Sequence, residues 1–460
     1  MNLSFLLTEH PFNDDEPLLH GPRRSLTAGE ARAGARAVAE EIRRAGIGPG
    51  HAVGVRLPNG PQAVVAMVGV WLAECVFVPM NHRAPPHEIE RVETLTGPAG
   101  VIDEGGLHAR PGGPPYDEGT AFVLWTSGTT GAPKAILHSH DAYIELLDRV
   151  LAPLRGQGTP GPPRRPTPNL IPVSLALNAG IYNTLFGLRA GAAIVIMDRF
   201  DTSTFAELVA RFEIRSTVLP PAAIAMLNDD ERVTDLSPLR YVRSITAPLS
   251  PLQARRFTAK FSAFVLNGYG QAEIGEVIGW TAADAKAHPD KVGAVGRPHA
   301  GVDIRFGDDG RLWVRPPNRA SGYAGGGELD DRIDAEGYVD TGDIARVDDE
   351  GFVWIEGRAG DVINRGGNKV FPGDVEEVLR LSPDVIDAAV VGMPDDRLGE
   401  VPVAFVTGGP VDPAALELLC RDHLVAYKVP VAFHLIASLP YNDTGKLLRA
   451  ELTVRLAEDA

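Results

Sequence analysis

The chain has 460 residues, which is too long for one small core and predicts two or more folding units. Its composition, 44% hydrophobic and 23% charged, is ordinary for a globular protein and argues against a disordered chain. A formal net charge of −16 argues against a general binder of nucleic acid or of anionic membranes, because both need a basic surface.

Cysteine usage and apolar stretches indicate a reducing, aqueous compartment. Cys75 and Cys420 are the only cysteines and lie far apart, so we expect two buried thiols rather than a disulfide or a zinc site. The N-terminal segment has no basic region of the kind that begins a signal peptide. The most apolar run, residues 63–73, is about half of the roughly 20 residues that a membrane span needs. We therefore expect a cytoplasmic protein without a membrane span, and its oligomeric state stays open.

The first part of the chain alternates helices with short strands. A helix over residues 27–46 is predicted to begin at Thr27, which fits a capping box with Glu30, and to end at Gly46. The alternation that follows is typical of an α/β architecture. In order, we predict a strand over 52–57, a helix over 61–74, strands over 76–78, 121–125 and 134–138, a helix capped by Ser139 with Ile144, Leu147, Leu151 and Leu154 on one face, and a surface loop over 156–167.

A second folding unit is predicted beyond residues 357–360. There the pattern gives a helix over 374–381, strands over 388–391 and 403–406, a helix over 413–424 and a strand over 433–436. The predicted fold class is α/β, with a large N-terminal domain of packed sheets and helices, residues 1–357, and a small mobile C-terminal α+β domain, residues 358–460.

The loop after the 121–125 strand carries the first functional signal. Residues 126–134 read TSGTTGAPK, in which glycines let backbone amides approach an anion and hydroxyls add donors. The loop is not a Walker A motif, which needs GxxxxGK[ST]. Since its lysine adds a charge for phosphate oxygens, we expect a triphosphate cradle made by Thr126, Ser127, Gly128, Thr129, Thr130, Gly131 and Lys134.

The segment LWTSGTTGAPK resembles the signature loop of the adenylate-forming superfamily, which includes acyl-CoA synthetases, adenylation domains of peptide synthetases and firefly-type luciferases. Further motifs resemble the family in the same order, from the region of Thr27 to Lys446, and acyl-CoA ligases are the closest branch. The resemblance implies an enzyme that uses ATP and Mg²⁺ to activate a carboxylic acid as its acyl-AMP, releasing pyrophosphate. Such an enzyme then transfers the acyl group to a thiol, here coenzyme A (CoA).

Two segments resemble the parts of the family that surround adenine. Residues 267–273, NGYGQAE, resemble the YGxTE motif, which implies that Tyr269 stacks on adenine and that Glu273 helps to hold Mg²⁺. An aromatic face suits a purine and a carboxylate is a hard oxygen ligand. Ala272 stands where threonine is usual. Residues 244–249, SITAPL, resemble a loop that usually reads SGGAPL. The implied nucleotide-binding residues of the two segments are Thr246, Ala247, Pro248, Gly268, Tyr269, Gly270, Gln271 and Ala272.

Motifs nearer the C-terminus resemble the family's ribose, hinge and lysine elements. Thr341-Gly342-Asp343 and the 357–361 segment imply that Asp343 and Arg358 contact the ribose and that Gly360 is the hinge. Gly367 matches the glycine that lets the pantetheine arm pass, and Lys446 of the PxxxxGK-like motif matches the adenylation catalyst. The implied catalytic set is Lys446, Glu273 and Lys134. Candidates for the CoA 3′-phosphate are Arg365, Lys369 and Arg449.

The predicted acyl pocket comprises Leu175, Asn178, Ile245 and Ile274. Residues 171–178 contain no acidic side chain, whereas peptide-synthetase domains for α-amino acids use an aspartate there, so such substrates are disfavoured. Ile245 replaces a glycine of the family loop and fills space, which favours a short, medium or unusually shaped apolar acid.

Three functions stay open from the sequence. The first is an acyl-CoA ligase, and the second is a stand-alone adenylating enzyme that loads an acyl carrier protein or forms an amide. The third, a non-catalytic nucleotide-binding relative, is disfavoured because the expected charged residues are all present: Lys134, Glu273, Asp343, Arg358 and Lys446.

Overall fold

The computed structural model describes residues 1–22, 24–126, 134–152, 166–245, 247–324, 329–441 and 447–459. The chain forms two compact units. The first unit comprises Met1–Val292, Pro298–Val302 and Pro316–Ile333, and the second comprises Gly293–Arg297, Asp303–Arg315 and Asp334–Ala460. The boundary predicted at residues 357/358 falls inside the second unit, and as the boundary of a moving domain it stays a prediction.

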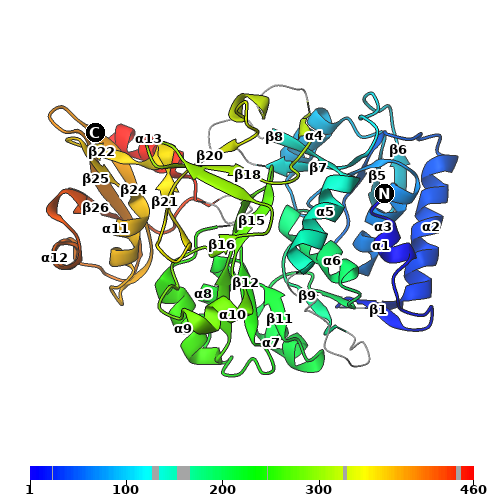
Figure 1. Ribbon diagram of the computed structural model, residues 1–460, viewed down its shortest axis with the longest axis horizontal. Coiled ribbons are helices and arrows are strands. Elements are labelled where there is room, and N and C mark those ends of the chain that lie inside the picture. Colours follow the sequence, from blue (N-terminus) through cyan, green and yellow to red (C-terminus); the bar gives the residue numbers. More distant parts are fainter. Residues whose placement is uncertain are drawn as a thin grey trace. The chain divides into compact units, whose positions relative to one another are not determined.

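The first unit contains two seven-stranded sheets (Figure 1) and the paired strands β14 (Tyr269–Gln271) and β15 (Gly275–Gly279) of a smaller sheet. One seven-stranded sheet has the order β19-β8-β7-β4-β3-β5-β6, with a parallel centre and antiparallel pairs at its edges. Its strands are β3 (Ala52–Val55), β4 (Val76–Pro79), β5 (Gly100–Asp103), β6 (Gly106–Ala109), β7 (Thr120–Thr126), β8 (Lys134–Ser139) and β19 (Gly322–Tyr323).

The other sheet has the order β13-β12-β11-β9-β10-β1-β2 and is parallel except for the β1–β2 pair. Parallel strands joined by helices are the expected product of alternating helix and strand patterns. Its strands are β1 (Pro17–His20), β2 (Ser25–Thr27), β9 (Asn169–Ile171), β10 (Ile194–Ile196), β11 (Ser216–Val218), β12 (Tyr241–Ser244) and β13 (Phe264–Asn267).

Helices α5 (His140–Leu151) and α6 (Asn178–Arg189) link the two sheets. α5 contacts β8 of the first sheet, α6 contacts β9 and β10 of the second, and the two helices contact each other. Ser139 starts α5 by accepting a hydrogen bond from the Ala142 amide. The other helices of this unit are α1 (Phe5–Thr8), α2 (Ala28–Arg44), α3 (Pro61–Leu72), α4 (Pro86–Thr96), α7 (Thr202–Arg211), α8 (Pro221–Asp229), α9 (Pro251–Phe261) and α10 (Ala282–Ala287).

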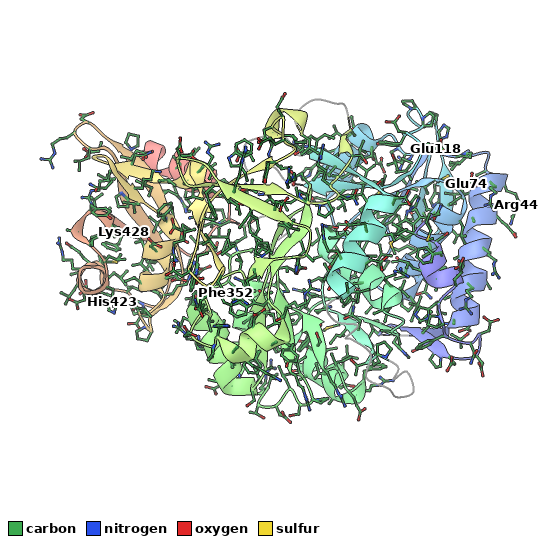
Figure 2. The ribbon with its side chains drawn as sticks, in the orientation of Figure 1. Arg44, Glu74, Glu118, Phe352, His423 and Lys428 are labelled. Carbon is green, nitrogen blue, oxygen red and sulfur yellow. The ribbon has the colours of Figure 1, made fainter. Side chains whose placement is uncertain are left out.

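The second unit contains two further sheets. An antiparallel sheet of four strands has the order β17-β18-β20-β21, and another has the path β23-β22-β25-β24 with β26 paired to β25. Figure 2 labels Lys428 in the second of these regions, where its Nζ lies 2.5 Å from a carboxylate oxygen of Asp374. The elements are β17 (Asp303–Phe306), β18 (Arg311–Arg315), β20 (Val339–Val347), β21 (Val353–Arg358), β22 (Ile363–Arg365), β23 (Asn368–Val370), α11 (Pro372–Leu379), β24 (Val385–Asp395), β25 (Gly399–Gly408), α12 (Pro413–His423), β26 (Ala432–Leu435) and α13 (Arg449–Asp459).

The predicted α/β fold class is confirmed, and most predicted elements lie within two or three residues of their observed bounds. The capping box of α2 is present, with Thr27 and Glu30 bonded reciprocally. Helix α3 ends at Leu72, before the predicted Glu74, which has φ 62°. In α5 the buried residues are Tyr143, Leu146 and Leu147 with their neighbours, whereas Ile144 is only partly buried.

The remaining expectations concern the 156–167 loop, the two cysteines and a membrane span. Leu154 and most of the predicted 156–167 loop lie outside those ranges. Cys75 and Cys420 are free and buried, and burial raises the pKa of each thiol to about 11. No helix within the described ranges has both the length and the apolar character that a membrane crossing requires.

Candidate active site

The two ends of the predicted phosphate loop are held together by a β-hairpin. Strands β7 and β8 pair antiparallel, with Thr126 opposite Lys134. The loop between them, Ser127–Pro133, lies outside the described residues, so the predicted roles of Ser127, Gly128, Thr129, Thr130 and Gly131 stay predictions. The observed pairing fixes where that loop begins and ends.

Lys134 and Glu273, two of the predicted catalytic residues, are linked through Tyr323. The Lys134 Nζ lies 5.1 Å from the centroid of the Tyr323 ring, a cation–π distance. The Tyr323 hydroxyl donates a hydrogen bond of 2.8 Å to Oε1 of Glu273. Burial, followed by the charge of Glu273, raises the pKa of Tyr323 to about 12, so this hydroxyl stays protonated at neutral pH. Sequence reasoning missed Tyr323, although it stands on the short strand that pairs with the strand of Lys134.

Arg332 completes this group from the other side. Its Nη1 lies 3.3 Å from Oε1 of Glu273, and its Nη2 donates a 2.9 Å hydrogen bond to the side-chain oxygen of Gln271. The Gln271 amide in turn lies 3.4 Å from the hydroxyl of Tyr269. The Glu273 side chain is only 14% exposed, so its carboxylate is held in one orientation by a neutral donor and a charged one.

One glycine of the predicted adenine-binding segment, Gly270, is required by a close backbone contact. β14 (Tyr269–Gln271) pairs antiparallel with β15 (Gly275–Gly279), and a Cβ on Gly270 would lie 2.1 Å from the Gly275 carbonyl oxygen. A Cβ on Gly268 would lie 3.3 Å from Ile245 and 3.5 Å from Oε1 of Glu276. The structure therefore brings Gly268 and Ile245 together. Thr246, which follows Ile245, lies outside the described residues, and the described chain resumes with Ala247 and Pro248.

The two predicted ribose-binding residues meet in the second unit. Asp343 on β20 lies opposite Arg358 on β21, and Nε of Arg358 is 2.8 Å from Oδ1 of Asp343. The Asp343 side chain is 6% exposed, and its backbone amide donates to the hydroxyl of Thr341. The TGD-like and GRAGD-like segments are thus one structural feature, joined by an ion pair across a strand pair.

The predicted hinge and CoA-related residues occupy a turn-rich part of the second unit. Gly360 lies in the 3₁₀ turn Ala359–Asp361, where a Cβ would have no neighbour within 4 Å. Gly367, between β22 and β23, has φ +86°, a conformation that favours glycine. Lys446 lies outside the described residues. The three candidates for the CoA phosphate make contacts within the second unit. Arg365 donates to the carbonyls of Tyr427 and Val429, Lys369 donates to the carbonyl of Asp309, and Arg449 is ion-paired with Glu376.

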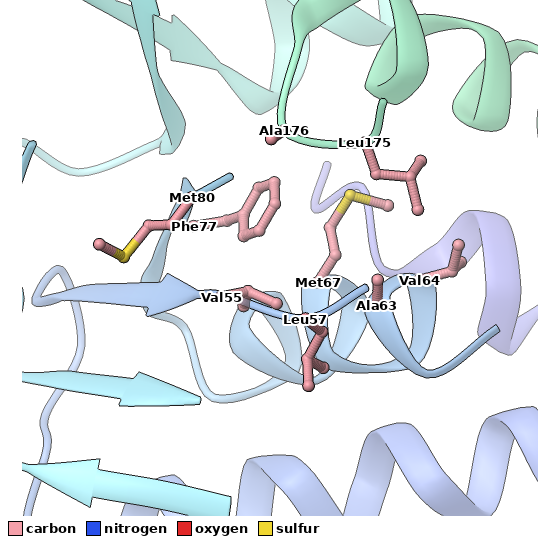
Figure 3. Close-up of a pocket in the computed structure, with 9 residues that line it drawn as sticks. All are labelled: Val55, Leu57, Ala63, Val64, Met67, Phe77, Met80, Leu175 and Ala176. Atoms are coloured by element: carbon pink, nitrogen blue, oxygen red, sulfur yellow. The ribbon is translucent and has the colours of Figure 1, made fainter. Parts of the chain in front are cut away.

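The residues of the predicted acyl pocket have different surroundings. Leu175 lines a cavity of about 20 Å³ among apolar side chains of α3, β3 and β4, which is room for about one water molecule (Figure 3). Asn178 accepts a 2.9 Å hydrogen bond from the Tyr143 hydroxyl. Ile274 is 1% exposed. A larger cavity of about 590 Å³ opens beside Tyr323, with Tyr116 and Leu137 in its lining.

A buried ion-pair cluster lies next to the adenine-binding segment and was missed from the sequence. Arg243 on β12 is ion-paired with Glu276 on β15, and His299 lies 3.3 Å from the same carboxylate. The guanidinium also lies over the rings of Tyr182 and Phe186, at 5.7 and 5.5 Å. Burial opposes ionisation of Glu276, but Arg243 and then His299 outweigh it and hold the pKa of Glu276 below its usual value.

The group formed by Lys134, Tyr323, Glu273 and Arg332 could bind an anion and neutralise its charge. Arg332 contacts the oriented carboxylate of Glu273, and Lys134 lies over the ring of Tyr323, which also holds that carboxylate. Such a set of charges would suit a nucleotide triphosphate with a divalent cation. Within the described residues, no group of three or more His, Cys, Asp or Glu side chains is arranged to hold a metal ion. A lone carboxylate nevertheless fits Mg²⁺ where substrate phosphates supply the other ligands.

Comparisons with known proteins give the family. The model of the AMP-binding enzyme family matches residues 9–113 and 103–324, and the model of the AMP-binding enzyme C-terminal domain matches residues 374–446. The chain is 29% identical to 4-coumarate–CoA ligase 3 of Oryza sativa subsp. japonica, over 94% of this chain and 88% of that protein. It is 28% identical to a sulfoacetate–CoA ligase of Cupriavidus necator, over 95% and 94%.

A solved structure with the same fold is the amide bond synthetase McbA from Marinactinospora thermotolerans, with a TM-score of 0.84, 26% identity and coverage of 98% of this chain and 99% of that one. The expected resemblance to adenylate-forming enzymes is confirmed by these matches. The chain therefore belongs to the AMP-binding enzyme family, with both its main domain and its C-terminal domain.

Proposed function

We propose that this protein is an ATP-dependent acid–CoA ligase, which forms an acyl-AMP from a carboxylic acid and then an acyl-CoA thioester. One observation carries the proposal: Lys134 contacts Tyr323, and Tyr323 contacts Glu273. Lys134 follows directly after a hydroxyl-rich loop, in a chain of the AMP-binding family. The names of the relatives 4-coumarate–CoA ligase and sulfoacetate–CoA ligase support CoA as the acceptor.

The first half-reaction needs charge neutralisation more than covalent chemistry. A carboxylate oxygen attacks the α-phosphorus of ATP and pyrophosphate leaves, so two anions must be aligned and screened. Glu273 would hold Mg²⁺, which supplies positive charge at the phosphates. Tyr323 and Arg332 orient the Glu273 carboxylate. Lys134 and Lys446 would provide the mobile charges on the phosphate and carboxylate oxygens.

The second half-reaction needs a different arrangement. The thiol of CoA attacks the acyl carbonyl as a thiolate, and AMP leaves with its phosphate oxygen. Lys446 has no role in that step, so we propose that the C-terminal domain, residues 358–460, rotates about Gly360 and exchanges Lys446 for the turn at Gly367. Gly367 has a positive φ, which favours glycine, and a residue without a side chain would let the thiol arm of CoA pass close to the backbone.

Amide formation is the second candidate. The specific observation in its favour is the 26% identity, over nearly the whole chain, to an amide bond synthetase. Both candidates share the acyl-AMP intermediate and differ only in the nucleophile that displaces AMP. Product analysis by mass spectrometry with CoA, an acyl carrier protein and a set of amines separates them: a thioester of CoA is expected, and an amide formed in preference would replace the proposal.

The role of Glu273 is tested by Glu273→Gln, which keeps the shape of the side chain and removes its charge. We expect acyl-AMP formation at a saturating acid to fall by roughly 10²- to 10³-fold, the usual cost of removing one positioned charge. Glu118→Gln is the matched control, because Glu118 is an exposed carboxylate of the same unit (Figure 2). Equal rates for both variants would reject the proposed site.

The hinge is tested by Gly360→Pro against Gly360→Ala. The site has room for a Cβ, so the alanine variant should retain both half-reactions. Proline fixes φ and restricts the residue before it, and we expect it to leave acyl-AMP formation largely intact while blocking thioester formation. Loss of both half-reactions to the same extent in the proline variant would reject the hinge role.

A further inference from the structure

Helix α5 contains a buried arginine, Arg149, which has an ion pair but no hydrogen bond among the described residues. The Arg149 side chain is 4% exposed, and none of its three guanidinium nitrogens has a hydrogen-bond partner among the residues that the structure describes. Glu145, one turn earlier, lies 3.8 Å from Nη1, which is beyond hydrogen-bonding distance. The Glu145 oxygen in this ion pair has no hydrogen bond within the described chain either.

A buried guanidinium without hydrogen bonds destabilises the folded protein when no ligand is bound. It has lost its water without gaining the hydrogen bonds that usually compensate a buried charge. Burial accordingly lowers the pKa of Arg149, against the opposing effect of Glu145, Tyr182 and Glu276. An apolar side chain would suit this position better, because α5 buries Leu146, Leu147 and Val150 around it. Native proteins rarely leave such groups unsatisfied, and a bound partner is one of the few explanations.

Arg149 lies close behind the segments that the proposed function assigns to the nucleotide. A Cβ on Gly275 would lie 2.8 Å from Leu146, so α5 contacts β15 at its start. The next residue, Glu276, and Tyr182 both influence Arg149 electrostatically. Glu276 in turn lies against Gly268 of the adenine-binding segment. Arg149 is therefore connected to the adenine-binding segment through Glu276.

We propose that Arg149 binds an anionic oxygen group, a carboxylate or a sulfonate, at the end of the acid substrate that is remote from the activated carboxylate. This inference rests on the proposed function and deepens it by naming the substrate class: acids with a second anionic group. It replaces the expectation of an apolar acid, which depended on Ile245 alone. Arg243 is not the binding group, because Glu276 already engages its guanidinium.

The geometry of the guanidinium favours this ligand class. Its planar set of donors matches the two oxygens of a carboxylate or sulfonate in a bidentate pair. Tyr182 adds a neutral donor beside it, since burial raises the pKa of this phenol to about 12. A hydrocarbon end would leave the arginine unsatisfied, and such a substrate gains nothing from its presence.

The experiment compares acids that differ only in the remote group: butanoate with butanedioate, hexanoate with hexanedioate, and butanoate with 3-sulfopropanoate. The readout is kcat/KM of acid-dependent ATP–pyrophosphate exchange for the wild type, Arg149→Met, Arg149→Lys and the control Arg36→Met, which makes the same change on an exposed face of α2. We expect the wild type and the control to prefer the dianionic acids. Arg149→Met should lose roughly 10- to 100-fold with those acids and little with the monoanionic ones. Arg149→Lys should fall between them.

Thermal unfolding gives a second readout that does not depend on turnover. The melting temperature of Arg149→Met alone should equal or exceed that of the wild type, because an unsatisfied charge has been removed. Butanedioate or hexanedioate should raise the melting temperature of the wild type and not that of Arg149→Met. A melting temperature lowered by Arg149→Met and restored by Arg149→Lys would assign Arg149 a purely structural role and overturn the inference.

The outcomes separate this inference from the function on which it rests. Exchange with monoanionic acids that is as fast as with dianionic ones, or an equal loss with both classes in Arg149→Met, overturns the inference alone and indicates that water satisfies the arginine. Absence of exchange with every acid overturns the proposed function as well.

Discussion

Arg243 and Arg149 are two arginines in the same region of the first unit, and they differ in one respect. Both are largely buried, and both interact electrostatically with Tyr182 and Glu276. Arg243 is ion-paired with Glu276, and His299 supports that carboxylate. Arg149 has only Glu145 at 3.8 Å and no hydrogen bond within the described residues. Burial alone therefore does not decide what a charge is for.

The contrast teaches how to separate structural from functional charges. A buried charge with its hydrogen bonds complete can stabilise one conformation, and its removal leaves the partner exposed to the full desolvation cost. A buried charge without hydrogen bonds keeps its donors available for a ligand, an ion or a water molecule. Substitutions at the two arginines and at their neighbours test this difference.

Arg243→Met should destabilise the protein strongly, because it leaves Glu276 buried without its main counter-charge. We expect the free energy of unfolding to fall by about 3–5 kcal/mol, measured by denaturant titration with a probe in the first unit. Arg149→Met should change it by less than about 1 kcal/mol. The double variant Arg243→Met with Glu276→Leu should recover much of the loss, because it removes both charges. Equal destabilisation by the two arginine variants would show that Arg149 stabilises the fold as much as Arg243 does.

Acid should weaken the Arg243–Glu276 pair and have no such action at Arg149. The folded-state pKa of Glu276 is held below its usual value by Arg243 and His299, against burial. Its stabilising contribution is therefore complete above the unfolded pKa of about 4.3 and is lost as the pH falls through the lower folded pKa. Between about pH 5 and pH 3, wild-type stability should fall more steeply than that of Glu276→Gln. Parallel curves would show that the pair is not ionised in the folded protein.

Tyr323→Phe should have the smallest effect, because it removes one neutral hydrogen bond and leaves Arg332 beside Glu273. We expect a loss of about 1 kcal/mol in stability and a change of less than about tenfold in the rate of acyl-AMP formation. Denaturant titration and single-turnover kinetics measure the two quantities. A loss as large as that of Glu273→Gln would mean that the hydroxyl takes part in the chemistry.

Much of the fold and part of the site could be predicted from the sequence. The helix that starts at Thr27 and the strand that ends at Thr126 follow from local capping chemistry and apolar runs. Lys134, Glu273, Asp343 and Arg358 stand in motifs whose order resembles a family. Local patterns of this kind can be predicted from the sequence because each depends on residues that are a few positions apart.

The remaining residues act through contacts that no local pattern records. Tyr323 meets Glu273 across 50 positions and Arg243 meets Glu276 across 33. Arg149 follows two leucines in an amphipathic helix, and only the packing of α5 against α6 shows that its side chain is buried. The Asp343–Arg358 pair was predicted as two ribose contacts, whereas the direct bond between them depends on strand register.

We propose that this chain makes acyl-AMP and that Lys446 is the adenylation catalyst. The most direct test is ATP–pyrophosphate exchange by the wild type and by Lys446→Ala, with Mg²⁺ and a panel of mono- and dianionic acids. We expect acid-dependent exchange by the wild type and a loss of roughly 10²- to 10³-fold in the variant. Exchange that never exceeds background with any acid, or an undiminished rate in Lys446→Ala, would contradict it.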